Sequence, residues 1–404
     1  MVHGLAMEHP FIETPFSSSL NSSDDTSSLR KAGSNSRNAS EAAKEIHQVL
    51  NPGSGDCVFF FCCADYDLSL LAEELNRLFR GCKLIGCTTA GEIVPTGLTR
   101  QSITAFALAP QEFAIETSCV TNLADFTEDD AQVLVDKMLE RLEVKAVADI
   151  SKHSFGLTLQ DGMSIREELV LKAYRAALNN IPLVGGSAGD NLHFHHTKVF
   201  YDGRFHSDAA ILVLVNTAHP FRVFQSHHLV ATREKLVVTR AAPSLRRVYE
   251  LNAEPAALEY CRINNLELQD LGPETFALYP LGVQLSDSIY VRSIQQVHDD
   301  LSLTFFCAID VGIVLTKMTT SGVLDHTKSL FSEITSAIGV PQLLFACDCI
   351  HRRIEIDKFE LVQDMSDLYQ RHNVIGFNTY GEQLDGMHLN HTFTGVAIGR
   401  ITNE

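Results

Sequence analysis

The feature that most constrains the fold is a short motif that occurs twice. Residues 85–92 (Ile-Gly-Cys-Thr-Thr-Ala-Gly-Glu) align without a gap with residues 375–382 (Ile-Gly-Phe-Asn-Thr-Tyr-Gly-Glu), and both share the pattern Ile-Gly-x-x-Thr-x-Gly-Glu. Residues 183–190 (Leu-Val-Gly-Gly-Ser-Ala-Gly-Asp) are a third, degenerate relative. Each full copy follows an apolar run that ends in Cys, then a helical pattern and a short strand. The chain is therefore expected to repeat one strand–helix–strand–turn unit.

The glycines of this motif allow two interpretations. A strand that enters a glycine-rich turn can bring its backbone close to another group. In one interpretation, two related domains use these glycines only to solve a packing problem. In the other, two turns face each other across a domain cleft and line a ligand pocket. Phosphate-binding loops are excluded because neither G-x-G-x-x-G nor G-x-x-x-x-G-K-[ST] occurs, and because a Glu in the turn repels phosphate.

Strand-like and helical patterns are interleaved along most of the chain. This predicts a mixed α/β fold of two domains, with mixed sheets and helices on their faces. Serine occupies ten of the twenty-four positions from Ser17 to Ser40, and such a segment buries little apolar surface. We therefore expect a disordered Ser-rich tail over residues 1–45, a first domain over 46–220 and a second over 221–404.

Two hairpins are expected in the first domain. The dipeptide Asp202-Gly203 between the strand-like residues 198–201 and 204–215 is a strong signal for a two-residue turn. The alternating residues 103–109 and 112–120 predict a second hairpin around an Ala-Pro-Gln turn.

Charge and cysteine usage exclude several classes of function. The 404 residues include 32 basic and 50 acidic side chains, a formal net charge of −18, which disfavours nucleic acid and anionic membrane surfaces as partners. No apolar run approaches the roughly 18–20 residues that span a bilayer, and no signal peptide is visible. Several of the ten cysteines lie in apolar strand-like runs, which indicates reduced, buried thiols and a cytoplasmic protein.

Four motifs, in order along the chain, resemble the FIST family in its N- and C-terminal portions. They are Leu-Ile-Gly-Cys-Thr-Thr-Ala-Gly-Glu-Ile, Pro-Leu-Val-Gly-Gly-Ser-Ala-Gly-Asp, Ile-Tyr-Val-Arg-Ser-Ile at 289–294, and Gly-Phe-Asn-Thr-Tyr-Gly-Glu followed by Asn390-His391-Thr392. The resemblance covers residues 58–401. It implies a FIST N-terminal sensory domain over 46–220 and a FIST C-terminal domain over 221–404. FIST proteins are sensory ligand-binding modules of signal transduction, proposed to bind small ligands such as amino acids.

Within the family the chain looks most like the NosP branch, which binds haem and senses nitric oxide. It has no kinase, cyclase or methyl-accepting segment of its own, and it contains 17 histidines. The resemblance implies haem b, because no Cys-x-x-Cys-His occurs. It also implies a non-enzymatic sensor that regulates a histidine kinase or a cyclic-di-GMP enzyme (a diguanylate cyclase or phosphodiesterase). A homodimer is compatible with this role. The alternative is an amino-acid-binding sensory module without haem.

His206 is the first choice for the axial haem ligand and hence for the iron. It follows the Asp202-Gly203 turn at the entry to the most apolar strand, where Asp208 or a backbone carbonyl could orient the imidazole. The alternative is a partly exposed histidine at a strand end.

His391 and His388 are the next candidates, although the Asn-His-Thr motif extends to FIST members without haem, which favours a role in the fold. Arg352 and Arg292 are candidates for binding a carboxylate, whether a haem propionate or an amino acid. Two further clusters contain side chains that could bind a metal or react: a histidine-rich loop that is expected to be solvated, and a Cys-rich strand end that is either redox-active or structural. Their members are His193, His195 and His196 for the loop, and Cys347, Cys349, His351 and Arg353 for the strand end.

Overall fold

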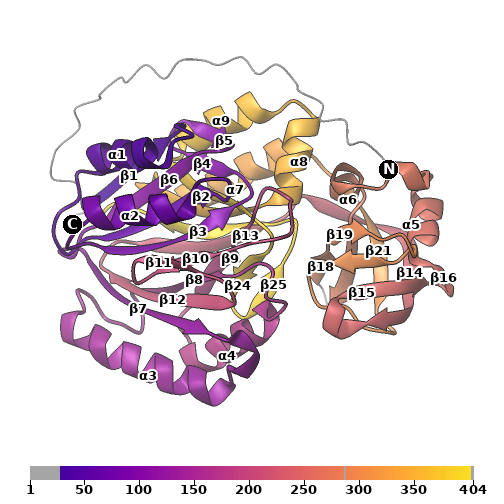
Figure 1. Ribbon diagram of the computed structural model, residues 1–404, viewed down its shortest axis with the longest axis horizontal. Coiled ribbons are helices and arrows are strands. Elements are labelled where there is room, and N and C mark those ends of the chain that lie inside the picture. The colour runs from indigo at the N-terminus through magenta and orange to yellow at the C-terminus, as the bar shows by residue number, and fades with distance from the viewer. Residues whose placement is uncertain (1–27, 286–287, 402–404) are drawn as a thin grey trace.

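The computed structural model describes residues 28–285 and 288–401, and it divides them into two parts. A larger body consists of three six-stranded sheets with helices on their outer faces, and a separate eight-stranded sheet is inserted into it (Figure 1). The insertion lies between β13 (Phe221–Ser226) and α7 (Val323–Ile338). None of the described helices combines the length and the hydropathy needed to cross a membrane.

The three sheets of the body have the same strand order. The first contains, in order, β1 (Leu29–Ser34), β6 (Ile103–Leu108), β2 (Cys57–Cys63), β3 (Lys83–Thr89), β10 (Val199–Tyr201) and β11 (Arg204–His206). The second contains β7 (Phe113–Thr121), β12 (Ala209–Thr217), β8 (Ser154–Gln160), β9 (Leu183–Ser187), β24 (Glu382–Leu384) and β25 (Met387–Leu389). The third contains β13, β26 (Phe393–Ile398), β22 (Leu343–Cys349), β23 (Val374–Thr379), β4 (Glu92–Val94) and β5 (Gly97–Thr99).

This order reveals a threefold repeat with exchanged hairpins. Each unit supplies four strands to its own sheet, and the two middle strands, such as β2 and β3, pair in parallel. The short hairpin that follows the glycine turn of each unit pairs with the sheet of another unit: β4–β5 joins β23, β10–β11 joins β3, and β24–β25 joins β9. The predicted repeat is therefore confirmed, and the degenerate motif at 183–190 is its third copy.

One predicted hairpin is confirmed and the other is wrong. β10 and β11 form the hairpin at Asp202-Gly203, whose φ angles of 49° and 79° are those that a tight two-residue turn requires. By contrast, β6 and β7 belong to different sheets. The chain passes from the first unit to the second between these two strands, so their local alternation reflects two separate pairings rather than one turn.

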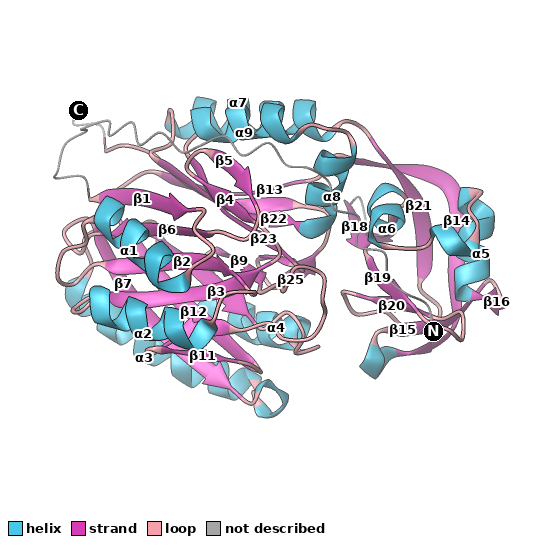
Figure 2. Ribbon diagram, turned by 45° about the horizontal axis from the view of Figure 1, so that its top comes forward, coloured by secondary structure: helices cyan, strands magenta, loops and turns pink. Residues whose placement is uncertain are grey.

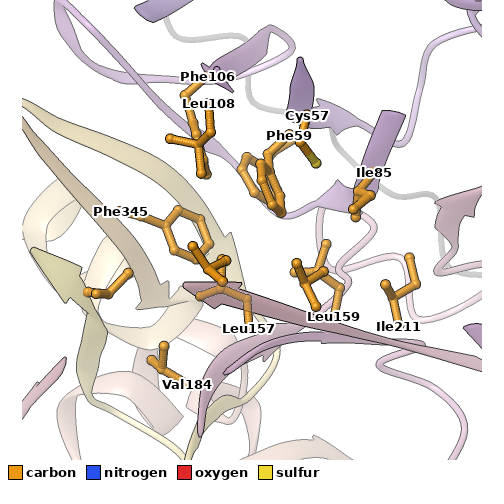
Figure 3. Close-up of a cluster of buried hydrophobic side chains, with 14 of the residues drawn as sticks. Cys57, Phe59, Ile85, Phe106, Leu108, Leu157, Leu159, Val184, Ile211 and Phe345 are labelled. Carbon is orange, nitrogen blue, oxygen red and sulfur yellow. The ribbon is translucent and has the colours of Figure 1, made fainter. Parts of the chain in front are cut away.

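A single hydrophobic core lies between the three sheets (Figure 3). In β2, Phe59 and Phe61 face this core, whereas Val58 and Phe60 face the helices outside. This follows from the alternation of side chains along a strand. Phe345 of the third sheet stacks on Phe61 with ring centroids 5.2 Å apart. The three units therefore share this central core, and each sheet has a second hydrophobic cluster against the helices on its outer face.

Helices cover the outer face of each sheet (Figures 1 and 2). They are α1 (Ala39–Leu50) and α2 (Leu68–Leu78) on the first sheet, α3 (Glu128–Lys145) and α4 (Glu167–Leu178) on the second, and α7, α8 (Ile350–Lys358) and α9 (Val362–Arg371) on the third. Three of them begin at side-chain caps that accept from backbone N–H groups, namely Asn38, Asp67 and Thr127.

The expected disordered tail over residues 1–45 is wrong in its last part. β1 pairs with β6 along its whole length, and α1 begins at Ala39. The prediction relied on the serine content and overlooked the apolar face of α1, whose buried residues recur at helical spacing from Ala39 to Leu50. Residues 1–27 lie outside the described part of the chain.

The inserted domain, residues 229–320, has its own core. Its sheet contains β14 (Leu229–Ala242), β15 (Arg247–Leu251), β17 (Leu281–Leu285), β18 (Ser288–Arg292), β19 (Ile294–Val297), β20 (Leu303–Phe305) and β21 (Val314–Thr320), with β16 (Glu254–Pro255) paired to β15. Two helices, α5 (Ala256–Asn264) and α6 (Pro273–Leu278), accompany it. The mixed α/β class is confirmed. The expected boundary at 220/221 falls between β12 and β13, inside the body, so the two structural parts do not follow it.

Candidate functional site

The three glycine turns meet at the centre of the body and contact one another directly. Backbone hydrogen bonds join them in a ring: Gly189 N to Thr88 O (3.0 Å), Ala90 N to Asn378 O (2.9 Å) and Ser187 N to Gly381 O (2.9 Å). The turns are therefore packed together rather than separated by a cleft. Of the two interpretations of the motif, packing is the one that fits this geometry.

The second residue of the Ile-Gly pattern shows why glycine is needed there. A Cβ atom on Gly86 would lie 2.3 Å from the carbonyl oxygen of Phe60 on the neighbouring strand. The equivalent distances are 1.9 Å for Gly185 and 1.8 Å for Gly376. All three approaches are far shorter than any carbon–oxygen contact, so each unit requires a glycine at this position.

The carboxylates that end the motif are buried and hydrogen-bonded. Glu92 accepts from the N–H (3.1 Å) and hydroxyl (2.7 Å) of Ser102 and from the hydroxyl of Thr89. Glu382 accepts in the same way from the N–H (3.0 Å) and hydroxyl (2.8 Å) of Thr392. Burial raises the pKa of Glu92 to about 7 and raises that of Glu382 well above its usual range. Each carboxyl group ties its turn to the strand that follows the exchanged hairpin.

This burial predicts a pH dependence of stability. Because the pKa of Glu92 is higher in the folded state, the folded state keeps a proton that the unfolded state releases. The contribution of this proton to stability is therefore complete below pH 4.5 and is lost as the pH rises towards 7. In Glu92→Gln this component should disappear, and the difference in unfolding free energy between the two proteins should change by about 3 kcal/mol between pH 4.5 and 7. Urea unfolding at several pH values measures it. Glu143→Gln, at an exposed site, is the control and should leave the pH profile unchanged.

A second group of polar residues lies where the inserted domain meets the body. Asn390 connects them: its side chain accepts from Ser293 N (3.4 Å) and donates to Tyr380 O (3.3 Å). Ser293 O in turn accepts from Phe306 N (3.0 Å). The ring of His351 lies 5.5 Å from that of Phe306 and 4.9 Å from that of His391. We name Arg292, Ser293, His351, His388 and His391 the junction cluster.

The junction cluster concentrates buried polar atoms that lack hydrogen-bond partners in the protein. Fourteen such side-chain atoms occur among the described residues, and six belong to the cluster: Arg292 Nε, Ser293 Oγ, His351 Nδ1, His388 Nε2 and both ring nitrogens of His391. Buried polar groups are usually satisfied, and each exception costs about 1–3 kcal/mol. Burial also lowers the pKa of His351 to about 3 and that of His391 well below its usual range. Both imidazoles are therefore neutral.

A buried ion pair borders the cluster. Arg246 of the inserted domain donates to Glu167 (2.6 Å) and Glu168 of α4, and to the carbonyl of Phe306 (2.5 Å). Burial opposes the charge on Glu168, yet its hydrogen bond to His388 and the charge of Arg246 hold its pKa well below its usual range. Glu167, Glu168 and His388 are close enough to hold a metal ion. The guanidinium of Arg246 already supplies the positive charge there.

The first choice for an axial ligand, His206, has a backbone-carbonyl contact of the kind expected for it but is not part of the junction cluster. Its ring lies half-buried on the β10–β11 hairpin, away from the junction cluster, with Nε2 3.1 Å from Tyr201 O. Asp208, the expected orienting carboxylate, instead accepts from Leu123 N (3.3 Å). His206 is thus a partly exposed histidine at a strand end, and one of its ring nitrogens contacts a backbone carbonyl.

Arg352 is also engaged elsewhere. It is buried, and its guanidinium contacts Asp348 (2.6 Å), Thr327 (3.2 Å) and His228 (3.1 Å). Each of its three nitrogen atoms already has a partner within the protein. Arg292, by contrast, makes only one hydrogen bond among the described residues, to the carbonyl of Val291 (3.3 Å).

The cysteines of the strand-end cluster are buried, whereas His351 of the same cluster belongs to the junction cluster. Burial raises the pKa of Cys347 and Cys349 well above the usual range, which opposes a reactive thiolate. The histidine loop is organised by Asp190, whose carboxylate accepts from three backbone N–H groups, those of Phe194 (2.9 Å), His195 (2.7 Å) and His196 (2.9 Å). The imidazoles of this loop are exposed, as expected.

The structure thus places His391, His388 and Arg292 where the inserted domain meets the body and leaves His206 on the β10–β11 hairpin. Arg352 lies near His391, but it pairs with Asp348. Sequence reasoning missed Ser293 and His351 as members of the site. Ser293 stands within the motif at 289–294 and His351 beside the Cys-rich strand end, but neither position signals burial without a partner. Arg246 and Glu168 carry no motif at all.

Comparison with known proteins supplies the context for this site. The FIST N domain model matches residues 56–254, and the FIST C domain model matches residues 256–385. The two matches meet inside the inserted domain, between β16 and α5. The chain is also similar to the uncharacterized protein MJ1623 of Methanocaldococcus jannaschii, with 24% identity over 368 residues that cover 80% of this chain and 70% of the relative.

Proposed function

Because the chain belongs to the FIST family, whose domains are sensory signalling modules, we propose that it is a sensor that binds a small carboxylate-bearing molecule, such as an amino acid, at the junction cluster. One observation carries this proposal: six unpartnered buried polar atoms of five residues gather between the inserted domain and the body. A polar ligand would satisfy atoms that the protein itself leaves without partners.

The chemistry of the cluster suits such a ligand. The guanidinium of Arg292 has no carboxylate partner among the described residues, and arginine binds carboxylates through two parallel hydrogen bonds. The neutral imidazoles of His351 and His391 can accept from an ammonium group, and the hydroxyl of Ser293 can donate or accept. The ligand would therefore bind through its charged ends.

The position of the cluster suggests how binding becomes a signal. Arg292 and Ser293 belong to the inserted domain, whereas His351, His388 and His391 belong to the body. A ligand that contacts both parts favours the arrangement in which both sets of contacts form, which is the requirement for a two-state sensor. A separate signalling protein, a histidine kinase or a cyclic-di-GMP enzyme, would respond to that arrangement.

The test is a binding screen of the full chain against the proteinogenic amino acids by thermal shift, followed by calorimetry. We expect one ligand class to stabilise the protein and Arg292→Gln to weaken its binding at least tenfold, because the variant loses the carboxylate partner. Arg233→Gln, at an exposed position of the inserted domain, is the matched control and should bind normally. Equal binding by the Arg292 variant, or no stabilisation by any amino acid, would contradict the proposal.

Haem is the second candidate, favoured by the two unpartnered ring nitrogens of His391. A neutral, buried imidazole is a suitable axial donor, and bound haem b would supply an iron that takes nitric oxide. A porphyrin also needs an apolar slot, and a cavity of about 650 Å³ lies elsewhere, at the β10–β11 hairpin, with none of the predicted ligand residues in its lining. Haem entry would therefore require the junction to open.

Absorption spectroscopy separates the two candidates. If haem binds, protein expressed with haem supplementation carries a Soret band that shifts on addition of nitric oxide, and His391→Ala abolishes it while His206→Ala leaves it unchanged. Colourless protein that still responds to an amino acid would reject haem and keep the first proposal.

A further inference from the structure

A cavity of about 650 Å³ opens at the tip of the β10–β11 hairpin. None of its lining residues belongs to the junction cluster. The polar side chains that line it belong to α2 and the turn after it, to β3 and β7, and to the hairpin itself: Asn76, Arg80, Lys83, Thr117, Tyr201 and Asp202. Its volume falls in the range of about 300–1,000 Å³ that is typical of small-molecule sites.

The threefold repeat allows this opening to be compared with the equivalent place in another sheet, where the hairpin tip contacts the neighbouring strand. We call this contact region between hairpin tip and strand the joint. In the second sheet, the equivalent hairpin β24–β25 carries the same turn, Asp385-Gly386. There the Asp385 side chain accepts from Leu183 N (3.0 Å), and Asp385 N donates to Leu183 O (2.8 Å). Gly386 packs against Arg175. The hairpin tip and the start of β9 are thereby sealed together.

The β10–β11 hairpin lacks this seal. Pairing with β3 stops at Phe200, one residue earlier than at the equivalent joint, where Leu384 still pairs with Val184. No hydrogen bond of the Asp202 side chain occurs among the described residues, and the tip is attached through Asn76 Nδ2, which donates to Gly203 O (2.8 Å). The same turn sequence closes one joint and leaves the other open.

The charges at the open joint favour an anion. Arg80 and Lys83 are both exposed, and neither side chain forms an ion pair or hydrogen bond with the described part of the chain. Asp202 is the one carboxylate in the lining, so the cations outnumber it. This local excess of positive charge stands out in a chain with a net charge of −18. The hydroxyl of Tyr201, which donates to Thr117 O (3.1 Å), adds a polar wall.

We propose that this cavity is a second binding site, for a small organic anion whose phosphate or carboxylate group is held by Arg80 and Lys83. Arginine and lysine together are the common partners of such groups. The remaining volume, walled in part by the side chains of Leu84 and Phe79, accommodates the organic body of the ligand. A bound ligand would bridge the hairpin tip and β3, as Asp385 does in the closed joint.

The test uses the full chain and three probes at low ionic strength: inorganic phosphate, adenosine monophosphate and citrate. We expect adenosine monophosphate or citrate to bind in calorimetry more tightly than inorganic phosphate. The double variant Arg80→Gln/Lys83→Gln should lose at least tenfold in affinity. The control Lys137→Gln/Arg141→Gln removes the same charge from an exposed face of α3 and should bind normally.

Each outcome of these titrations either identifies the ligand class or overturns the proposal. Preference for adenosine monophosphate assigns the site to organic phosphates, and preference for citrate assigns it to carboxylates. If inorganic phosphate binds as tightly as adenosine monophosphate and citrate, the proposal that the ligand is organic is overturned. Binding of none of the probes, unchanged affinity in the double variant, or an equal loss in the control would overturn the site. Circular dichroism confirms folding of the variants, and Arg292→Gln, which tests the junction cluster, should leave this binding intact.

Discussion

Gly376→Ala is expected to destabilise the protein by about 3 kcal/mol or more, because the new Cβ would lie 1.8 Å from the carbonyl oxygen of Ala346. That oxygen belongs to the backbone of the neighbouring strand β22, so no side-chain rotation relieves the overlap. The strands must separate, and with them the ring of turns at the centre of the body. Urea or thermal unfolding measures the loss.

A glycine elsewhere provides the control for this prediction. Gly272 precedes α6, has an extended backbone and has no atom within 4 Å of the position that a Cβ would take. Gly272→Ala should cost less than about 1 kcal/mol, the range of changes at a helix N-cap. A Gly376 variant as stable as the Gly272 variant would show that the strands adapt, and would refute the packing role of the motif.

Arg352→Met should destabilise the protein by about 3–5 kcal/mol, because it leaves the carboxylate of Asp348 buried without its charged partner. Asp348 then retains the hydroxyl of Tyr369 (3.0 Å) as a side-chain donor. His228 also loses a contact, and its other ring nitrogen faces Glu355 (2.6 Å). The substitution therefore disturbs a network that joins β22 to α8 and α9.

The matched control removes one partner of an exposed ion pair. Lys172 contacts Glu128 at 2.7 Å, with side chains 74% and 57% exposed. Lys172→Met should leave the unfolding free energy almost unchanged, as expected for a solvent-screened pair. The double variant Asp348→Asn/Arg352→Met should recover part of the loss, since no unpaired charge remains. If the single Arg352 variant is as stable as the control, the buried pair is not structural, and Arg352 is again available as a ligand group.

Local patterns in the sequence predicted those features that depend on neighbouring residues. The apolar run before the first full motif forms a buried strand, the Asp202-Gly203 turn forms a hairpin, and the shared motif marks equivalent strand ends. The period of a strand and the φ angles of a turn are properties of a few consecutive residues. For this reason these predictions hold wherever the units are placed.

The exchange of hairpins could not be predicted from such patterns. The hairpin β4–β5 has the same signals whether it pairs with its own sheet or with β23, which is about 280 residues distant in the sequence. The failed hairpin at residues 103–120 has the same origin, since alternation shows that a segment is a strand but not which strand it pairs with. Likewise, no composition shift marks the start of the inserted domain.

The amino-acid sequence by itself determined the repeated unit, the mixed α/β class and the set of histidines and arginines from which a site could be built. Only the tertiary structure decided which of them meet. His206 and His391 occupy equivalent stretches near the ends of exchanged hairpins, yet one ring lies half-buried against a carbonyl and the other is buried with both nitrogens free. The physical reason is that the solvation and hydrogen bonding of a side chain depend on the segments packed against it. The His391 ring lies against His351 of α8, whereas the His206 ring lies against Tyr201 of its own hairpin.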